Sequence, residues 1–172
     1  MIALAIISLC TVVLLIGYNL CRHGELPHSI SAMAYRLPRK QRFLWTLSMW
    51  AAVFTLTPIT FEVIPDHLEA IPHAFATTML LITLMPLVKR NMSNGHRALI
   101  VAAGIFSQAC VIVACPWLLL LWPAAFLYFF LMDVTTNDIP RIFWGKGSIV
   151  AELLCYAALY LSAMIKYIMT NG

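Results

Sequence analysis

Long apolar runs dominate this chain, and short segments that carry most of its charge separate them. The runs cover residues 2–20, 43–63, 73–88, 98–132 and 147–165. A helix needs about 20 residues, at a rise of about 1.5 Å each, to cross a hydrocarbon core about 30 Å thick. Most of the runs are close to that length, so the pattern predicts helices that span a membrane.

The run over residues 98–132 is too long for one span, because as a single helix it would extend over about 52 Å. We expect a break at Cys115-Pro116-Trp117, since the residue before a proline is pushed out of the helical region. The predicted fold is therefore all-α, a polytopic membrane protein with one domain over residues 1–172. Its bundle has six transmembrane helices, over about 2–20, 43–63, 73–88, 98–114, 116–132 and 147–165. Without the break there are five.

The segment between the first two spans is too long for a simple turn and has a helical pattern of its own. Its apolar residues recur at helical spacing: Ile30, Met33, Ala34 and Leu37. Polar residues lie around the other face: Ser31, Tyr35 and Arg36. Pro27 suits a first helical turn, and Pro38 ends the pattern. We expect residues 28–37 to form a short helix in the inner membrane interface.

Charge predicts the orientation of these spans. Ten of the eleven Lys and Arg residues lie in three segments between the runs, over residues 21–42, 89–97 and 133–146. Basic loops stay in the cytoplasm, which puts both termini outside and favours six spans, because all three segments then share one side. The first run has no cationic segment before it and no small-residue cleavage site, so we interpret it as a span and not as a signal peptide.

The composition agrees with a membrane protein and limits the partners. Hydrophobic residues make up 62% of the chain and charged residues 10%, against roughly a quarter charged in soluble domains. The net charge of +4 comes from residues next to the spans, where anionic head groups attract them. We therefore expect membrane lipids as partners, with a membrane-protein partner or a second copy, and no nucleic acid. The lack of long loops and cleavable signals favours a bacterial inner membrane.

Glu152 is the most informative polar residue, because it lies within the last predicted span. A carboxylate there costs on the order of 2.5–3.5 kcal/mol at mid-membrane. Three residues share its face at helical spacing: Ser148, Tyr156 and Tyr160. We expect Glu152 to point into the bundle, as an acid or base, a proton carrier or a ligand anchor. The alternative is a carboxylate paired near the inner surface with Arg97, His96 or an arginine of the first loop.

Gln108 is a second polar residue deep in a predicted span, and its amide needs partners. It serves either as a link between helices or as a substrate contact. The small residues beside it indicate a crowded helix interface: Ala103, Gly104 and Ser107. The tryptophans lie mostly near span ends, as interfacial anchors do. The predicted ligand-binding residues are Glu152, Tyr156, Ser148, Gln108, Arg36 and Arg39.

The parts of a nucleophilic site are also expected at the inner surface: Ser29, Ser31, His96, Asp133 and Glu152. In such a site the base lies within hydrogen-bond reach of the nucleophile. The chain has no G-x-S-x-G or H-E-x-x-H motif and no metal-ligand spacing of Cys and His, so we expect no metal and no cofactor. The two serines can equally cap the short helix. The candidate catalytic residues, if this is an enzyme, are Ser29, Ser31, His96 and Glu152.

Three stretches carry a resemblance to a known group of proteins. They are Pro27-His28-Ser29-Ile30-Ser31 after the first span, Asn94-Gly95-His96-Arg97 before the fourth, and Glu152 in the last. In this order of parts the chain resembles the Frag1/DRAM-type six-helix membrane proteins and their uncharacterised bacterial relatives. The resemblance implies a role in lipid-linked membrane processes, including maturation of lipid anchors. One departure is that the first loop, expected on the non-cytoplasmic side in that group, is the most basic segment here.

Little of the chain lies outside the predicted spans to form a separate active domain. We therefore expect a small non-enzymatic membrane protein that binds a lipid or amphiphile at the inner leaflet, or scaffolds a membrane complex. Two alternatives stay open. One is a membrane-embedded lipid hydrolase or transferase that uses the candidate catalytic residues. The other is a small proton-coupled transporter built around Glu152 and Gln108.

Overall fold

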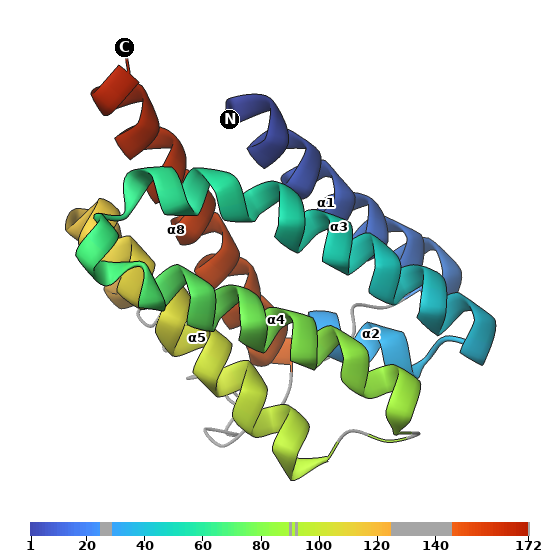
Figure 1. The fold of residues 1–172 in the computed structure, drawn as a ribbon. Helices are drawn as coiled ribbons and strands as arrows, with labels where there is room; N and C mark the ends of the chain where they lie inside the picture. Colours follow the sequence, from blue (N-terminus) through green and yellow to red (C-terminus); the bar gives the residue numbers. More distant parts are fainter. Residues whose placement is uncertain (25–28, 90, 92, 125–145, 172) are drawn as a thin grey trace.

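The part of the chain that the computed structural model describes consists of helices and the short connections between them. It comprises residues 1–24, 29–89, 91, 93–124 and 146–171, with the side chains of 146–148 left out. In order, the elements are α1 (Ile2–His23), α2 (Ile30–Tyr35), α3 (Arg39–Val63), η1 (Asp66–Leu68), α4 (Ala70–Val88), α5 (Asn94–Ala114), η2 (Pro116–Leu120) and α8 (Lys146–Asn171). Within this part, α1, α3, α4, α5 and α8 are long and apolar enough to cross a membrane (Figure 1). The all-α class is confirmed.

The long helices form one bundle, and the two chain ends lie together. Helix α3 packs against α1 and α4, and α5 packs against α4 and α8. The start of α1 and the end of α8 lie at one end of the bundle, and the short helix α2 lies toward the other (Figure 1). That second end is called the α2 end below.

Helices α3, α4 and α5 begin earlier than the apolar runs predicted, and α1 and α8 end later. Helix α3 starts at Arg39 instead of residue 43, α4 at Ala70 instead of 73, and α5 at Asn94 instead of 98. Helix α8 continues through Lys166 to Asn171, past the predicted end at residue 165. The physical reason is that hydropathy marks the hydrocarbon core, whereas a helix continues into the polar interface until a cap or a proline ends it. At the start of α5, for example, the Ser93 hydroxyl accepts a hydrogen bond from the His96 N–H.

The predicted break at Pro116 is confirmed. Helix α5 ends at Ala114, Cys115 has an extended backbone with φ of −158°, and η2 begins at Pro116. Residues 121–124 are helical again. Trp122 Nε1 donates to Gln108 Oε1 at 2.9 Å, and these two residues lie equally far from Cys115 along the chain. The chain therefore turns back beside α5. The remainder of the predicted span 116–132 lies outside the described residues from 125 onward.

Helix α2 is shorter than the predicted helix over residues 28–37. Ser29 caps it, and the Ser29 hydroxyl accepts from the Ala32 N–H at 3.0 Å. The predicted apolar face is buried: Ile30, Met33, Ala34 and Leu37. The prediction that Ser31 lies on a polar outer face is wrong, because Ser31 is only 5% exposed. Helix α2 packs against α1, α3 and α4, so little of its circumference reaches the surface.

Arg42 fixes the end of α2 against its neighbours. Its guanidinium donates to the carbonyl oxygens of Leu37 at 2.8 Å, Tyr35 at 3.0 Å and Pro86 at 3.3 Å. The first two bonds satisfy carbonyls at the end of α2, and the third satisfies a carbonyl in the last turn of α4. Burial raises the pKa of the Tyr35 hydroxyl, and the nearby charge of Arg42 partly offsets that rise.

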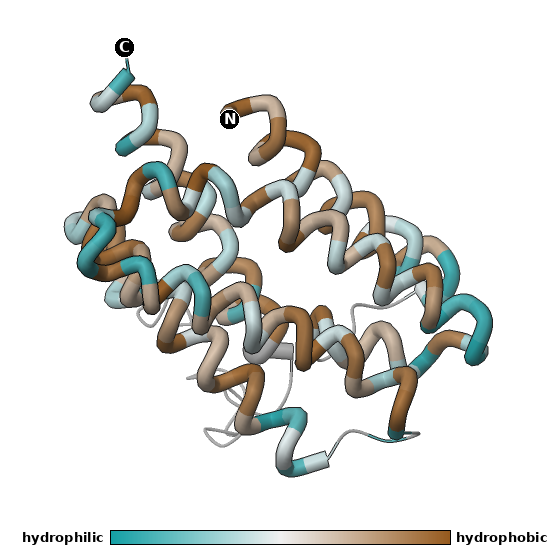
Figure 2. Tube along the Cα trace, viewed as in Figure 1, coloured by the Kyte–Doolittle hydropathy of each residue, from teal (hydrophilic) through white to brown (hydrophobic). Residues whose placement is uncertain are grey.

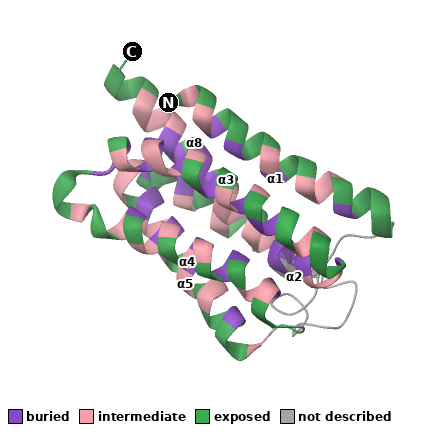
Figure 3. Ribbon diagram, turned by 45° about the vertical axis from the view of Figure 1, so that its right-hand side comes forward, coloured by how far each residue is buried: buried purple, intermediate pink, exposed green. Residues whose placement is uncertain are grey.

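Apolar side chains cover the outside of the bundle as well as its inside. Brown, hydrophobic residues recur along much of the long helices in Figure 2, and Figure 3 shows exposed residues along the same helices. Leu14 is 71% exposed and Ile105 63%. Exposed apolar surface on this scale is characteristic of a surface that faces lipid or a partner, which is compatible with an integral membrane protein.

Polar contacts between helices hold the bundle together inside. The Ser8 hydroxyl of α1 donates to the Ala52 carbonyl of α3 at 2.5 Å and shares a hydrogen bond with the Tyr160 hydroxyl of α8. Between α3 and α4, the Thr46 hydroxyl donates to the Thr83 carbonyl at 2.9 Å. Hydrogen bonds of this kind add to van der Waals packing where no hydrophobic force drives helices together.

Candidate functional site

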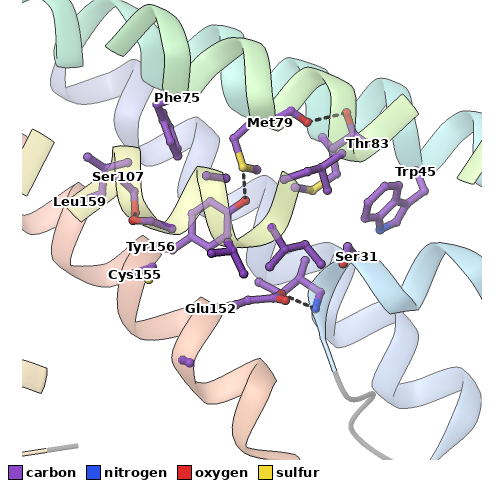
Figure 4. A pocket seen from close by; sticks show the side chains of 18 of the residues that line it. Ser31, Trp45, Phe75, Met79, Thr83, Ser107, Glu152, Cys155, Tyr156 and Leu159 are labelled. Carbon is purple, nitrogen blue, oxygen red and sulfur yellow. Dashed lines mark hydrogen bonds between the residues drawn. The ribbon is translucent and has the colours of Figure 1, made fainter. Parts of the chain in front are cut away.

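A cavity of about 290 Å³ lies among α2, α3, α4, α5 and α8 (Figure 4). Most of its wall is apolar, including Met49 of α3, Phe75 and Met79 of α4, and Leu159 of α8. Polar side chains gather where α2 meets α8 (Figure 4). The cavity thus has an apolar body and a polar end, as ligand sites commonly do.

Small residues on α5 and α8 create this space. Ala103, Gly104 and Ser107 line it from α5, and Ala151 lines it from α8. A Cβ atom added at Gly104 would meet no heavy atom of the described residues within 4 Å. Ala103 and Ser107 are buried where α5 packs against α4 and α8, whereas Gly104 between them faces the open space of the cavity.

Glu152 points into the bundle, as its position in an apolar run predicted. Its Oε2 accepts a hydrogen bond from the backbone N–H of Ile30 at 2.7 Å, which links α8 to the first residue of α2. The free N–H groups at a helix start suit a carboxylate. The other oxygen, Oε1, is buried without a hydrogen-bond partner among the described residues. Glu152 lines the cavity, and Oε1 is the oxygen of its carboxylate that the described residues leave without a partner.

Trp45 supplies a second buried polar atom without a partner. Its side chain is 3% exposed and lines the cavity, and Nε1 has no hydrogen-bond acceptor among the described residues. By contrast, Trp50 on the same helix donates from Nε1 to the Thr83 hydroxyl at 2.8 Å. In Figure 4, Ser31 lies between Trp45 and Glu152. Sequence reasoning grouped Trp45 with interfacial anchors, although it shares a helical face with Met49 and Ala52, which are also buried.

Tyr156 lies deeper in the cavity. Its hydroxyl donates to the Met79 sulfur at 3.5 Å (Figure 4). A thioether is a weak acceptor, so this hydroxyl can take a stronger partner from a ligand. The structure thus brings together Glu152 and Tyr156 of the predicted binding residues.

The other predicted binding residues lie elsewhere. Gln108 accepts from Trp122 and donates from Nε2 to the Ser107 hydroxyl at 3.3 Å, so its amide links two segments, as one of the two interpretations predicted. Arg36 follows α2 and Arg39 begins α3, and neither is among the described residues that line the cavity. The side chain of Ser148 lies outside the described residues.

The candidate catalytic residues do not form a triad in the described part of the chain. Ser29 caps α2, as the alternative interpretation predicted, and its hydroxyl lies 3.2 Å from that of Ser31. His96 Nδ1 lies 3.3 Å from the Tyr35 hydroxyl, while its Nε2 is buried and has no hydrogen-bond partner among the described residues. Ser31 and Glu152 line the cavity, but His96 does not. Asp133 lies outside the described residues.

An apolar cavity with polar side chains at one end can hold a molecule that has an apolar body and a polar head. No group of three or more metal-ligating side chains occurs within the described ranges. Comparison with protein families, curated proteins and solved structures finds no match. The cavity and its two unpartnered polar atoms are therefore the features that bear on function.

Proposed function

We propose that this protein binds a single-chain lipid or a similar amphiphile inside its helix bundle. The polar head lies at the α2 end beside Glu152, and the apolar part extends along the cavity. The observation that carries the proposal is the buried, unpartnered Oε1 of Glu152 at one end of an apolar cavity. A buried polar atom without a partner costs about 1–3 kcal/mol, and a ligand with a matching group recovers that cost.

The size of the cavity favours one chain over two. Its volume of about 290 Å³ is roughly twice that of an engineered cavity of about 150 Å³ that binds benzene. It lies near the lower limit of ligand pockets, which measure about 300–1,000 Å³. One acyl chain segment fits such a volume, whereas the two chains of a membrane phospholipid exceed it.

Binding without catalysis is the function that the contacts support best. A serine nucleophile needs a base within hydrogen-bond reach. His96, the predicted base, makes its described side-chain hydrogen bond to Tyr35 on α2, and Ser29 is engaged in capping that helix. Glu152 is held through the backbone of Ile30, which suits a residue that orients a ligand.

We further propose six spans in a bacterial inner membrane, with both termini outside the cytoplasm and α2 at the inner interface. Helices α5 and α8 both run away from the α2 end (Figure 1), so the chain has to return to that end between them. Trp122 beside Gln108 marks the start of the return. The basic residues Arg36, Arg39 and Arg42 belong to the same end, which the positive-inside rule puts in the cytoplasm.

This orientation predicts the behaviour of reporters joined to the C-terminus. Alkaline phosphatase fused after residue 172 should be active in a bacterial host, because it folds outside the cytoplasm. Green fluorescent protein exported unfolded to the same place should stay dark. An inactive alkaline phosphatase fusion together with a fluorescent green fluorescent protein fusion would contradict the six-span orientation.

The binding proposal predicts a loss of ligand when the carboxylate is removed. The wild-type chain, extracted in mild detergent, should retain one single-chain amphiphile in native mass spectrometry, and Glu152→Ala should lose most of it. Glu62→Ala is the matched control, because Glu62 is an exposed carboxylate toward the far end of α3. An adduct that survives Glu152→Ala, or that Glu62→Ala removes equally, would count against the proposal.

A further inference from the structure

Two unpartnered polar atoms of opposite kind belong to the wall of the same cavity. Trp45 Nε1 is a hydrogen-bond donor, and Glu152 Oε1 is an acceptor when the carboxylate is ionised. Both are buried without a partner among the described residues, and both side chains line the cavity. In Figure 4 they lie on either side of Ser31. A ligand that satisfies both needs a head group that donates and accepts.

We propose that this head group is uncharged and carries hydroxyls, as in a monoacylglycerol. The inference rests on the proposed function and specifies its ligand. A hydroxyl has one donor and two acceptor lone pairs, so it can serve both atoms. It also complements Oε1 of Glu152 in either protonation state, since it accepts from a carboxyl O–H as readily as it donates to a carboxylate.

Charged head groups match the site less well. An ammonium group can pair with the Glu152 carboxylate, but it has donors and no acceptor, so it leaves the N–H of Trp45 unpaired. A carboxylate or phosphate accepts from Trp45 but meets the negative charge of Glu152. Among the described residues that line the cavity, Glu152 is the only charged one, so no described lysine or arginine of the wall offsets that repulsion.

Tyr156 fits the next part of such a ligand. Its hydroxyl lines the cavity and donates to the Met79 sulfur at 3.5 Å. An ester carbonyl oxygen is a stronger acceptor than a thioether, so the ester of a monoacylglycerol can take this hydrogen bond. The chain beyond it lies against apolar residues such as Phe75 and Leu159.

The test compares three probes that share a ten-carbon chain: monodecanoylglycerol, decylamine and decanoate. Each is titrated into the wild-type protein in mild detergent at neutral pH, with native mass spectrometry to count bound molecules. Monodecanoylglycerol should bind about tenfold more tightly than either charged probe, because each of those leaves a buried group unpaired or repelled.

Two tryptophan variants test whether the N–H of Trp45 contributes to the binding of monodecanoylglycerol. Trp45→Phe keeps a ring but removes the unpaired N–H, and should weaken binding of monodecanoylglycerol about fivefold to tenfold. Trp50→Phe is the control, since the Trp50 N–H already donates to Thr83 inside the protein, and it should leave binding unchanged.

The outcomes separate this inference from the proposed function. Tightest binding of decylamine or decanoate, or equal affinity of Trp45→Phe and wild type for monodecanoylglycerol, would overturn the hydroxyl head group and leave an amphiphile site in place. Failure of all three probes to bind the wild-type protein would contradict the proposed function itself. The probe preference of the wild type needs no variant, so it decides the question even where a variant folds poorly.

Discussion

Gly104→Leu should lower the affinity for monodecanoylglycerol to about 100-fold below that of the wild type. Gly104 lines the cavity, and a Cβ there meets no heavy atom of the described residues within 4 Å. The leucine side chain therefore occupies space that the acyl chain needs. Displacing about four methylenes at about 0.8 kcal/mol each costs about 3 kcal/mol, or roughly 100-fold. The affinity can be measured by the quenching of tryptophan fluorescence with a brominated probe, since Trp45 and Trp122 line the cavity.

Gly17→Leu is the matched control for this substitution. Gly17 lies in α1, and a Cβ there also meets no described heavy atom within 4 Å. It is not among the described residues that line the cavity. Both changes replace a helical glycine by a better helix former, so neither should lower the unfolding temperature. Equal affinity of Gly104→Leu and Gly17→Leu for the probe would contradict the position of the binding site.

Ile30→Pro should lower the free energy of unfolding by about 2 kcal/mol more than Ile30→Ala, because a hydrogen bond to a charged group contributes about 1.5–3 kcal/mol. Ile30 is the first residue of α2, where helices tolerate proline. Ser29 before it is extended, with φ of −155° and ψ of 160°, as a residue before proline should be. Both substitutions remove the isoleucine side chain, but only proline removes the N–H that donates to Glu152.

A double-mutant cycle isolates that hydrogen bond. With Glu152→Leu in the background, the carboxylate is absent, so proline and alanine at position 30 should differ by much less. Reversible unfolding in mixed detergent micelles gives the four free energies. If the difference between proline and alanine were the same with and without Glu152, the link between α8 and α2 would not be the cause.

Local chemistry made part of this fold predictable. The hydropathy pattern located α1, α3, α4 and α5, because lipid selects for apolar runs of a fixed length. The break at Pro116 followed from the steric effect of proline on the residue before it. The spacing of Ile30, Met33, Ala34 and Leu37 identified the buried face of α2 correctly. Each of these features depends on residues that are close together in the sequence.

The cavity could not be predicted in the same way, because it depends on how neighbouring helices rotate and how closely they approach. Small residues such as Gly104 are compatible with tight packing and with an open space, and the sequence alone does not distinguish the two. The inward direction of Glu152 followed from the cost of burying a carboxylate. Its hydrogen bond to Ile30 involves a backbone N–H, which every residue except proline has, so no side-chain pattern marked it.

The measurement that tests the central claim most directly is native mass spectrometry of the wild type, Glu152→Ala and Gly104→Leu, each released from membranes of the same composition. We predict one adduct per wild-type chain, with the mass of a single-chain amphiphile, and its loss in both variants. Glu152→Ala removes the polar contact and Gly104→Leu fills the apolar space, so the two variants act on opposite ends of one site. A wild-type chain without an adduct, or the same adduct on all three proteins, would contradict a ligand site in this cavity.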